Sequence, residues 1–154
     1  MVKKTVVMIL LVVGAAAAIF TALSGVLTLL VGGPGSGGGD LTVTWFAPLF
    51  LAPLGVAGSL GILIASLVSK HRRALTSWAV AALVILLALI AAVFQFSGLA
   101  QGDIEPTESI WGTVAVTLCY VQVVGLLGIG ALGVALMRDV LATHETHARA
   151  SLAP

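Results

Sequence analysis

Residues 79–93 read AVAALVILLALIAAV, a run of fifteen apolar residues without a polar interruption. A strand of a membrane barrel alternates apolar and polar side chains, so this run predicts a helix in lipid. The composition extends the inference to the whole chain of 154 residues, because 60% are hydrophobic, 8% are charged and the mean hydropathy is +1.19. Since a soluble domain carries roughly 25% charged residues, we expect an all-α integral membrane protein.

The charged residues divide the chain into long apolar segments. Uncharged stretches run over 5–39, 41–69, 74–102 and 109–137. Each is long enough for the ~20 residues that a helix needs to cross a ~30 Å hydrocarbon core. We therefore expect one membrane domain, a four-helix transmembrane bundle followed by a short tail over 138–154. The expected spans are about 5–31, 46–68, 75–96 and 111–137.

Basic and acidic residues fall on opposite sides of this arrangement. With four spans, one side would hold all seven cations: Lys3, Lys4, Lys70, Arg72, Arg73, Arg138 and Arg149. Because basic loops stay in the cytoplasm, both termini should be cytoplasmic, in a cell or inner membrane. The other side would hold Asp40 and an acidic loop made of Asp103, Glu105 and Glu108. A cysteine introduced at Ser36 should accordingly react only from that outer side.

The expected spans contain no Asp, Glu, Lys, Arg or His. Proton relays, voltage sensors and histidine-ligated haem all require such residues. Ser59, Ser66 and Cys119 have no base beside them in the spans to activate them, and a single cysteine makes neither a disulfide framework nor a cysteine-rich metal site. A net charge of +1 argues against nucleic-acid binding. We therefore expect a protein that is not an enzyme, with no catalytic residue, cofactor or metal.

Two polar segments outside the spans have an ordinary interpretation and a more specific one. His144 and His147 could share a helix face of the tail, but two ligands make a poor metal site, so a solvated or partner-facing tail is favoured. The acidic loop favours a helix start near Trp111 through the helix dipole. Its three carboxylates lack the ligand spacing of a calcium site, although a basic soluble partner could dock there.

Small residues recur at helical spacing in three of the four spans. In the first span the intervals are 4, 3, 4 and 3, which places the residues on one helix face. In lipid, small side chains let helix backbones approach closely. We expect these faces to pack inside the bundle or to dock on another chain, so that Gly14→Leu or Gly25→Leu impairs packing or assembly. The residues are Gly14, Ala18, Thr21, Gly25 and Thr28 in the first span, Gly55, Gly58, Ser59 and Ser66 in the second, and Gly125, Gly128, Gly130 and Gly133 in the fourth.

Two amides and a proline are the remaining unusual residues of the spans. Gln122 follows Trp111 by about 16 Å of helix, near the bilayer centre, where its amide needs a hydrogen-bond partner. With Tyr120 it could instead contact a quinone or a lipid carbonyl. Gln95 should point toward a neighbouring helix of the outer leaflet. Pro53 should kink the second span, because it removes a hydrogen bond of the helix ladder.

These features favour a non-catalytic accessory or structural subunit of a larger integral membrane complex, such as a respiratory or photosynthetic electron-transport assembly. Its partners would be lipids and other integral membrane subunits, in a hetero-oligomer rather than a homo-oligomer. Two alternatives remain open. One is a lipid-, quinone- or pigment-binding membrane protein that uses the kinked second span. The other is a small homo-oligomeric channel or transporter with a polar lining of Thr113, Thr117, Tyr120 and Gln122.

Overall fold

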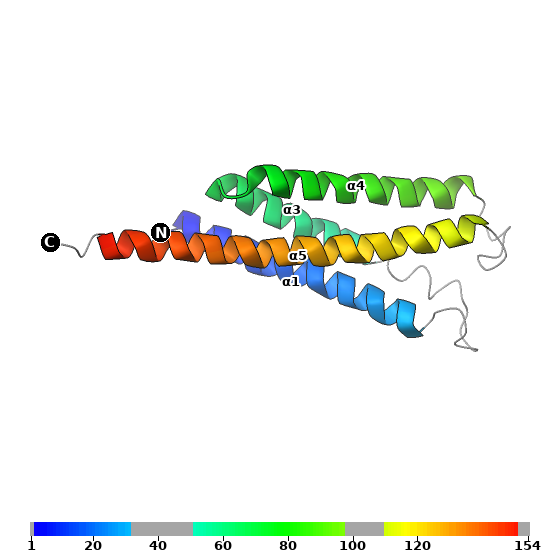
Figure 1. Cartoon of the computed structure of the whole chain (residues 1–154), viewed down its shortest axis with the longest axis horizontal. Coiled ribbons are helices and arrows are strands. Elements are labelled where there is room, and N and C mark those ends of the chain that lie inside the picture. Colours follow the sequence, from blue (N-terminus) through cyan, green and yellow to red (C-terminus); the bar gives the residue numbers. More distant parts are fainter. Residues whose placement is uncertain (1, 32–50, 98–109, 151–154) are drawn as a thin grey trace.

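A computed structural model describes residues 2–31, 51–97 and 110–150, and side chains within these ranges at 4–28, 51–97 and 110–143. The described residues form helices α1 (Val2–Val31), α3 (Ala52–Ser69), α4 (Arg73–Phe96) and α5 (Ile110–Ala150), numbered as in Figure 1. All four are long and apolar enough to cross a membrane, and no strand occurs in the ranges described. The prediction of an all-helical chain with four such helices is confirmed.

Helix α3 begins later than the sequence predicted. The expected second span started near residue 46, whereas the helix begins at Ala52 and places Pro53 in its first turn. The backbone N–H groups of Leu54 and Gly55 donate to the carbonyl of Leu51, at 3.0 and 3.2 Å. A first-turn residue has no intrahelical acceptor for its N–H, so a proline there removes no hydrogen bond. The predicted kink at Pro53 is therefore wrong.

A turn of three residues joins α3 to α4. Lys70 and Arg72 both adopt left-handed backbone conformations, with φ values of 64° and 48°. Such a conformation costs a non-glycine residue about 1–2 kcal/mol, so other contacts of the turn must offset it. The carbonyl of Arg72 accepts from both the backbone N–H and the hydroxyl of Thr76, at 3.0 and 3.1 Å. The reversal makes α3 and α4 antiparallel neighbours, as a connection this short requires (Figure 1).

The closest helix contact joins α1 to α3. A Cβ atom added to Gly14 would lie 2.6 Å from the backbone oxygen of Gly58, and one added to Gly58 would lie 2.7 Å from the oxygen of Gly14. Only hydrogen fits between the two backbones at this point. Helix α5 covers the pair, with Gly133 placed against Ile62 and Ala15. The core therefore forms where α1, α3 and α5 meet, and Leu11, Ile62 and Leu136 are fully buried there.

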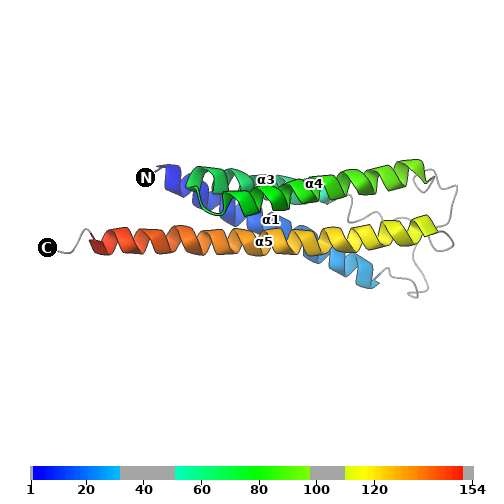
Figure 2. The same ribbon diagram turned by 45° about the horizontal axis from the view of Figure 1, so that its top comes forward.

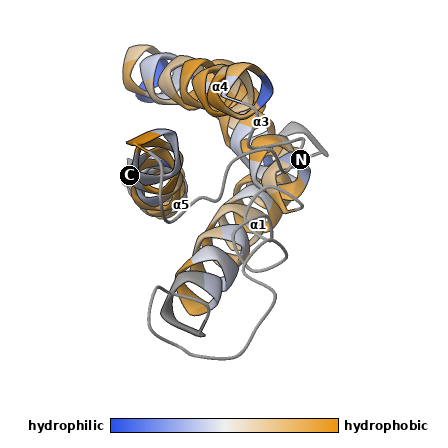
Figure 3. Ribbon diagram, turned by 90° about the vertical axis from the view of Figure 1, so that its right-hand side faces the viewer, coloured by the Kyte–Doolittle hydropathy of each residue, from blue (hydrophilic) through white to orange (hydrophobic). Residues whose placement is uncertain are grey.

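The helices splay apart away from this core. Viewed along the bundle, α4 and α1 diverge from their meeting point at α3, and α5 lies between them (Figure 3). Large hydrophobic side chains are exposed on all four helices, and orange, apolar segments recur along the ribbon (Figure 3), which is typical of helices in lipid. The beginning of α1, the α3–α4 turn and the end of α5 share one end of the bundle, called the turn end below (Figures 1 and 2).

Candidate functional site

The small-residue face of α1 packs inside this chain. Gly14, Ala18, Thr21 and Gly25 are all buried. A Cβ atom at Gly25 would lie 2.8 Å from Cγ2 of Val123 on α5. The hydroxyl of Thr21 donates to the carbonyl of Ala17 at 2.8 Å, so its polar group is satisfied within the helix. This face therefore contacts α3 and α5.

The small residues of α3 lie in the same interface. A Cβ atom at Gly55 would lie 3.1 Å from Leu126 and 3.2 Å from Thr21. Ser59 is fully buried, and its hydroxyl donates to the carbonyl of Gly55 at 2.7 Å. Both residues therefore lie where α1, α3 and α5 pack together, and the hydroxyl of Ser59 is satisfied within its own helix.

The glycines of α5 divide into two pairs with different surroundings. Gly130 and Gly133 pack against α1 and α3, and a Cβ atom at Gly130 would lie 2.6 Å from Cγ1 of Ile19. At Gly125 and Gly128, by contrast, no atom within 4 Å would meet a Cβ atom. Gly128 is exposed, and so are its neighbours on that side of α5: Val121, Val124, Leu127 and Ala131. We call these residues, together with Gly125, the outward face of α5.

The polar residues predicted in the spans lie in different environments. Gln122 is 2% exposed, and its Oε1 atom has no hydrogen-bond partner among the described residues. Tyr120 and Gln95 are exposed instead. Thr113 and Thr117 are exposed as well, and the hydroxyl of Thr117 donates to the carbonyl of Thr113 at 2.8 Å. Gln122 therefore does not share a face with the other members of the proposed channel lining.

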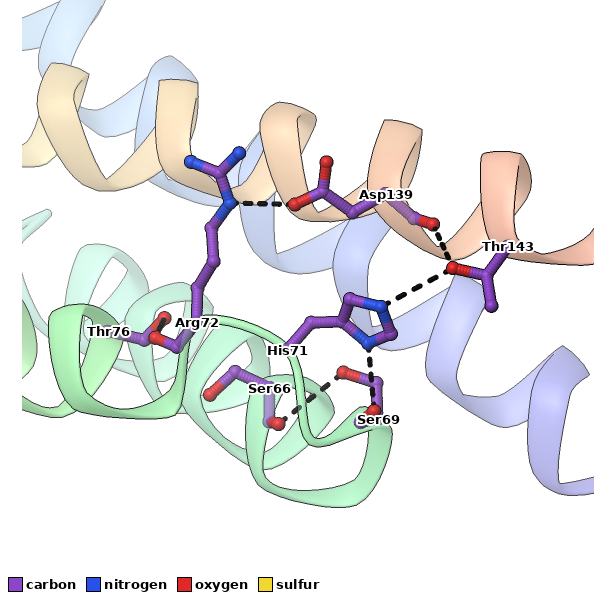
Figure 4. Close-up of polar contacts among 7 residues, drawn as sticks. All are labelled: Ser66, Ser69, His71, Arg72, Thr76, Asp139 and Thr143. Atoms are coloured by element: carbon purple, nitrogen blue, oxygen red, sulfur yellow. Dashed lines mark hydrogen bonds and ion pairs between the residues drawn. The ribbon is translucent and has the colours of Figure 1, made fainter.

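A polar cluster at the turn end was not predicted from the sequence. Nε of Arg72 lies 2.7 Å from Oδ2 of Asp139 on α5, in a hydrogen-bonded ion pair (Figure 4). The ring of His71 lies against the same helix, with Nδ1 2.9 Å from the carbonyl oxygen of Ser69 and Nε2 3.4 Å from Oγ1 of Thr143. These contacts attach the turn to α5 across 67 positions of sequence.

A signal for this cluster was present in the sequence. Asp139 lies two residues beyond the last expected span, on the side where residues 70–73 supply three cations, so an ion pair between the two segments could have been predicted. The sequence predicts that residues 138–148 continue the fourth helix as a tail, but this prediction paired none of these residues with the turn. The helix continues without a break to Ala150.

The remaining predicted sites lie outside the described residues. They are the acidic loop with Asp103, Glu105 and Glu108, and the side chains of His144 and His147. Among the side chains that are described, no group of three or more His, Cys, Asp or Glu residues could hold a metal ion. Cys119 is buried as a free thiol in α5.

Comparisons with protein-family models, with curated proteins and with solved structures found no match for this chain. Arguments about function therefore depend on the physical features of its helices.

Proposed function

We propose that the chain is a non-catalytic accessory subunit of a larger integral membrane complex and that it docks through the outward face of α5. The observation that carries the proposal is the open space at Gly125 and Gly128. A glycine in a helix interior costs about 1 kcal/mol relative to alanine, and at Gly130 and Gly133 close packing within the chain offsets that cost. At Gly125 and Gly128 a partner helix would provide the same contact.

The chemistry of the face favours a helix as partner. Its members are glycine, alanine and aliphatic residues, and small residues let a second backbone approach closely enough for van der Waals contact to drive association in lipid. The expected spans contain no Asp, Glu, Lys, Arg or His, and proton chemistry inside a membrane usually requires one. We propose other integral membrane subunits as the partners, because the chain has little soluble mass to offer a soluble protein.

Substitution of a single glycine tests the proposal. The tagged full chain is extracted from its native membranes in mild detergent, and the mass and composition of the particle are measured. We expect a particle with other membrane chains, lost with Gly128→Leu and retained with Ala81→Leu. The control has the same bulk at an exposed position of α4. The purified single chain should show no visible absorption band.

Four results would contradict the proposal. A particle made only of this chain would indicate the homo-oligomeric channel, as would selective ion flux through liposomes that contain nothing else. A particle that contains one copy of this chain and no other protein would show that the outward face of α5 binds no partner. Equal assembly with the two leucine variants would show that the outward face of α5 is not the contact.

A further inference from the structure

A groove opens at the turn end, between the α3–α4 turn and α5. It has a volume of about 370 Å³ and is lined by Arg72, Ala135, Arg138, Asp139 and Ala142. Its volume falls within the ~300–1,000 Å³ typical of small-ligand sites. The four residues from α5 have spacings of 3, 4 and 7 from Ala135, so they lie on one face of the helix. The two alanines leave space on either side of the charged pair.

The charges of the groove favour an anion. Two arginines and one aspartate line the groove, and the carboxylate is already paired with Nε of Arg72. The Nη atoms of Arg72 point away from Asp139 (Figure 4), and its side chain is 47% exposed. Arg138 is exposed and makes no ion pair with the described residues. Guanidinium groups bind phosphate through paired N–H donors, so the groove presents unused donors to a phosphate group.

The position along α5 indicates where such a phosphate would come from. Trp111 and Arg138 are 27 residues apart in one continuous helix. At ~1.5 Å per residue they are separated by roughly 40 Å, close to the ~40–45 Å thickness of a bilayer with its headgroups. With Trp111 at one interface, where tryptophan is enriched, Arg138 reaches the phosphate level of the opposite leaflet.

We propose that this groove binds the phosphate of an anionic phospholipid, with Arg138 and the Nη atoms of Arg72 as donors and Asp139 as the residue that orients Arg72. Ala135 and Ala142 accommodate the glycerol part of the headgroup. Lys70 on the turn and Arg73 at the start of α4 add positive charge at the same end and attract anionic lipid to it. This inference is independent of the partner proposed for the outward face of α5.

The test uses the full chain in nanodiscs of phosphatidylcholine with increasing phosphatidylglycerol, and native mass spectrometry counts the lipids that stay bound after release. We expect the wild-type protein to retain phosphatidylglycerol preferentially. Arg138→Gln should reduce that preference well beyond the about fivefold effect that any one basic residue near an anionic surface contributes. Arg73→Gln is the matched control, because it removes the same charge at the first residue of α4, which does not line the groove, and it should cost no more than that general effect.

A second variant tests the groove without a change of charge. Ala142→Leu should fill the space and reduce retention of phosphatidylglycerol as strongly as Arg138→Gln. Equal losses for Arg138→Gln and Arg73→Gln would overturn the site and leave only a diffuse surface attraction. Full retention in Ala142→Leu would also overturn it. Displacement of the lipid by excess free phosphate would show that the ligand is a soluble anion, which contradicts the lipid assignment.

Discussion

The α1–α3 crossing and the outward face of α5 contain the same kind of residue in different surroundings. At the crossing, Gly14 and Gly58 bring two backbones together, and each would meet the other's carbonyl oxygen below 3 Å if it carried a Cβ atom. On α5, Gly125 and Gly128 would carry a Cβ atom without meeting any described neighbour within 4 Å. The first pair is a structural requirement of the fold of this chain. The second pair is not, which is why we assign it to a partner.

The comparison shows that a small-residue motif predicts close packing but not the identity of the packed surface. Both sets of glycines have helical spacing, and both lie in apolar segments. A contact within the chain and a contact with another chain require the same side chains, since van der Waals packing drives both in lipid. The four predictions below are ordered by their expected effect on the stability of the isolated chain, from the largest to the smallest.

The largest effect is expected for Gly14→Ala. The added methyl group must displace the backbone of α3 at Gly58, and backbone cannot move aside as a flexible side chain can. Overpacking of this kind costs about 1–3 kcal/mol, and we expect the upper half of that range even though alanine has the better helix propensity. The measurement is the free energy of unfolding of the purified chain in detergent.

Gly61→Ala is the matched control for this variant. It adds the same methyl group to α3 one turn beyond Gly58, where the nearest atom would be the oxygen of Leu10 at an ordinary 3.5 Å. The free energy of unfolding of Gly61→Ala should equal that of the wild-type chain or slightly exceed it. If Gly14→Ala and Gly61→Ala behaved alike, the α1–α3 crossing would not be a contact between backbones.

Gln122→Leu should stabilise the isolated chain by about 1 kcal/mol. The amide is buried with its Oε1 atom unpaired among the described residues, and an unsatisfied buried polar group costs about 1–3 kcal/mol. Leucine occupies a similar volume without that cost. Tyr120→Leu, at an exposed position of the same helix, is the control and should change stability much less. Destabilisation by Gln122→Leu would show that the amide has a partner in the protein as purified.

The sequence predicted the helices well because their boundaries depend on local chemistry. Charged residues cannot enter the hydrocarbon region at low cost, so Lys70 and Arg73 had to end the second and begin the third helix. The short loop between them then required antiparallel neighbours. The kink at Pro53 was predicted wrongly because the expected start of the second span followed the apolar residues before this proline. The preference of proline for the first turn of a helix places the start where the structure has it.

The sequence could not predict which glycines pack inside the bundle and which face outward, because that depends on how the helices cross. Gly128 and Gly130 are two residues apart, so roughly 200° of helix rotation places them on opposite faces. The sequence around them is apolar on all sides and does not mark which face turns inward. The contact between Arg72 and Asp139 likewise depends on α4 and α5 lying side by side at the turn end, so the opposite charges in the sequence indicate an ion pair there but not which cation forms it.

The outward face of α5 provides the third prediction, opposite in sign to the first. Gly128→Ala should stabilise the isolated chain by about 0.5–1 kcal/mol, because alanine has the higher helix propensity and the methyl group enters open space. Gly130→Ala is the control on the same helix and should destabilise, since its Cβ atom would lie 2.6 Å from Ile19. A loss of stability in Gly128→Ala, with the chain shown to be monomeric, would mean that this position is packed after all.

The ion pair at the turn end should have the smallest effect. Its Arg72 and Asp139 side chains are 47% and 33% exposed, and exposed pairs typically contribute about 0.2–1 kcal/mol. A double-mutant cycle with Arg72→Gln and Asp139→Asn measures the coupling between them, and we expect it to fall at high salt because salt screens exposed charges. A coupling above about 3 kcal/mol, or one insensitive to salt, would place the pair in a dry environment, where loss of one partner leaves a buried charge. The turn would then be as essential to the fold as the α1–α3 crossing. A weak coupling would instead agree with the site proposed here, in which Asp139 orients Arg72 while its Nη atoms stay available to a lipid phosphate.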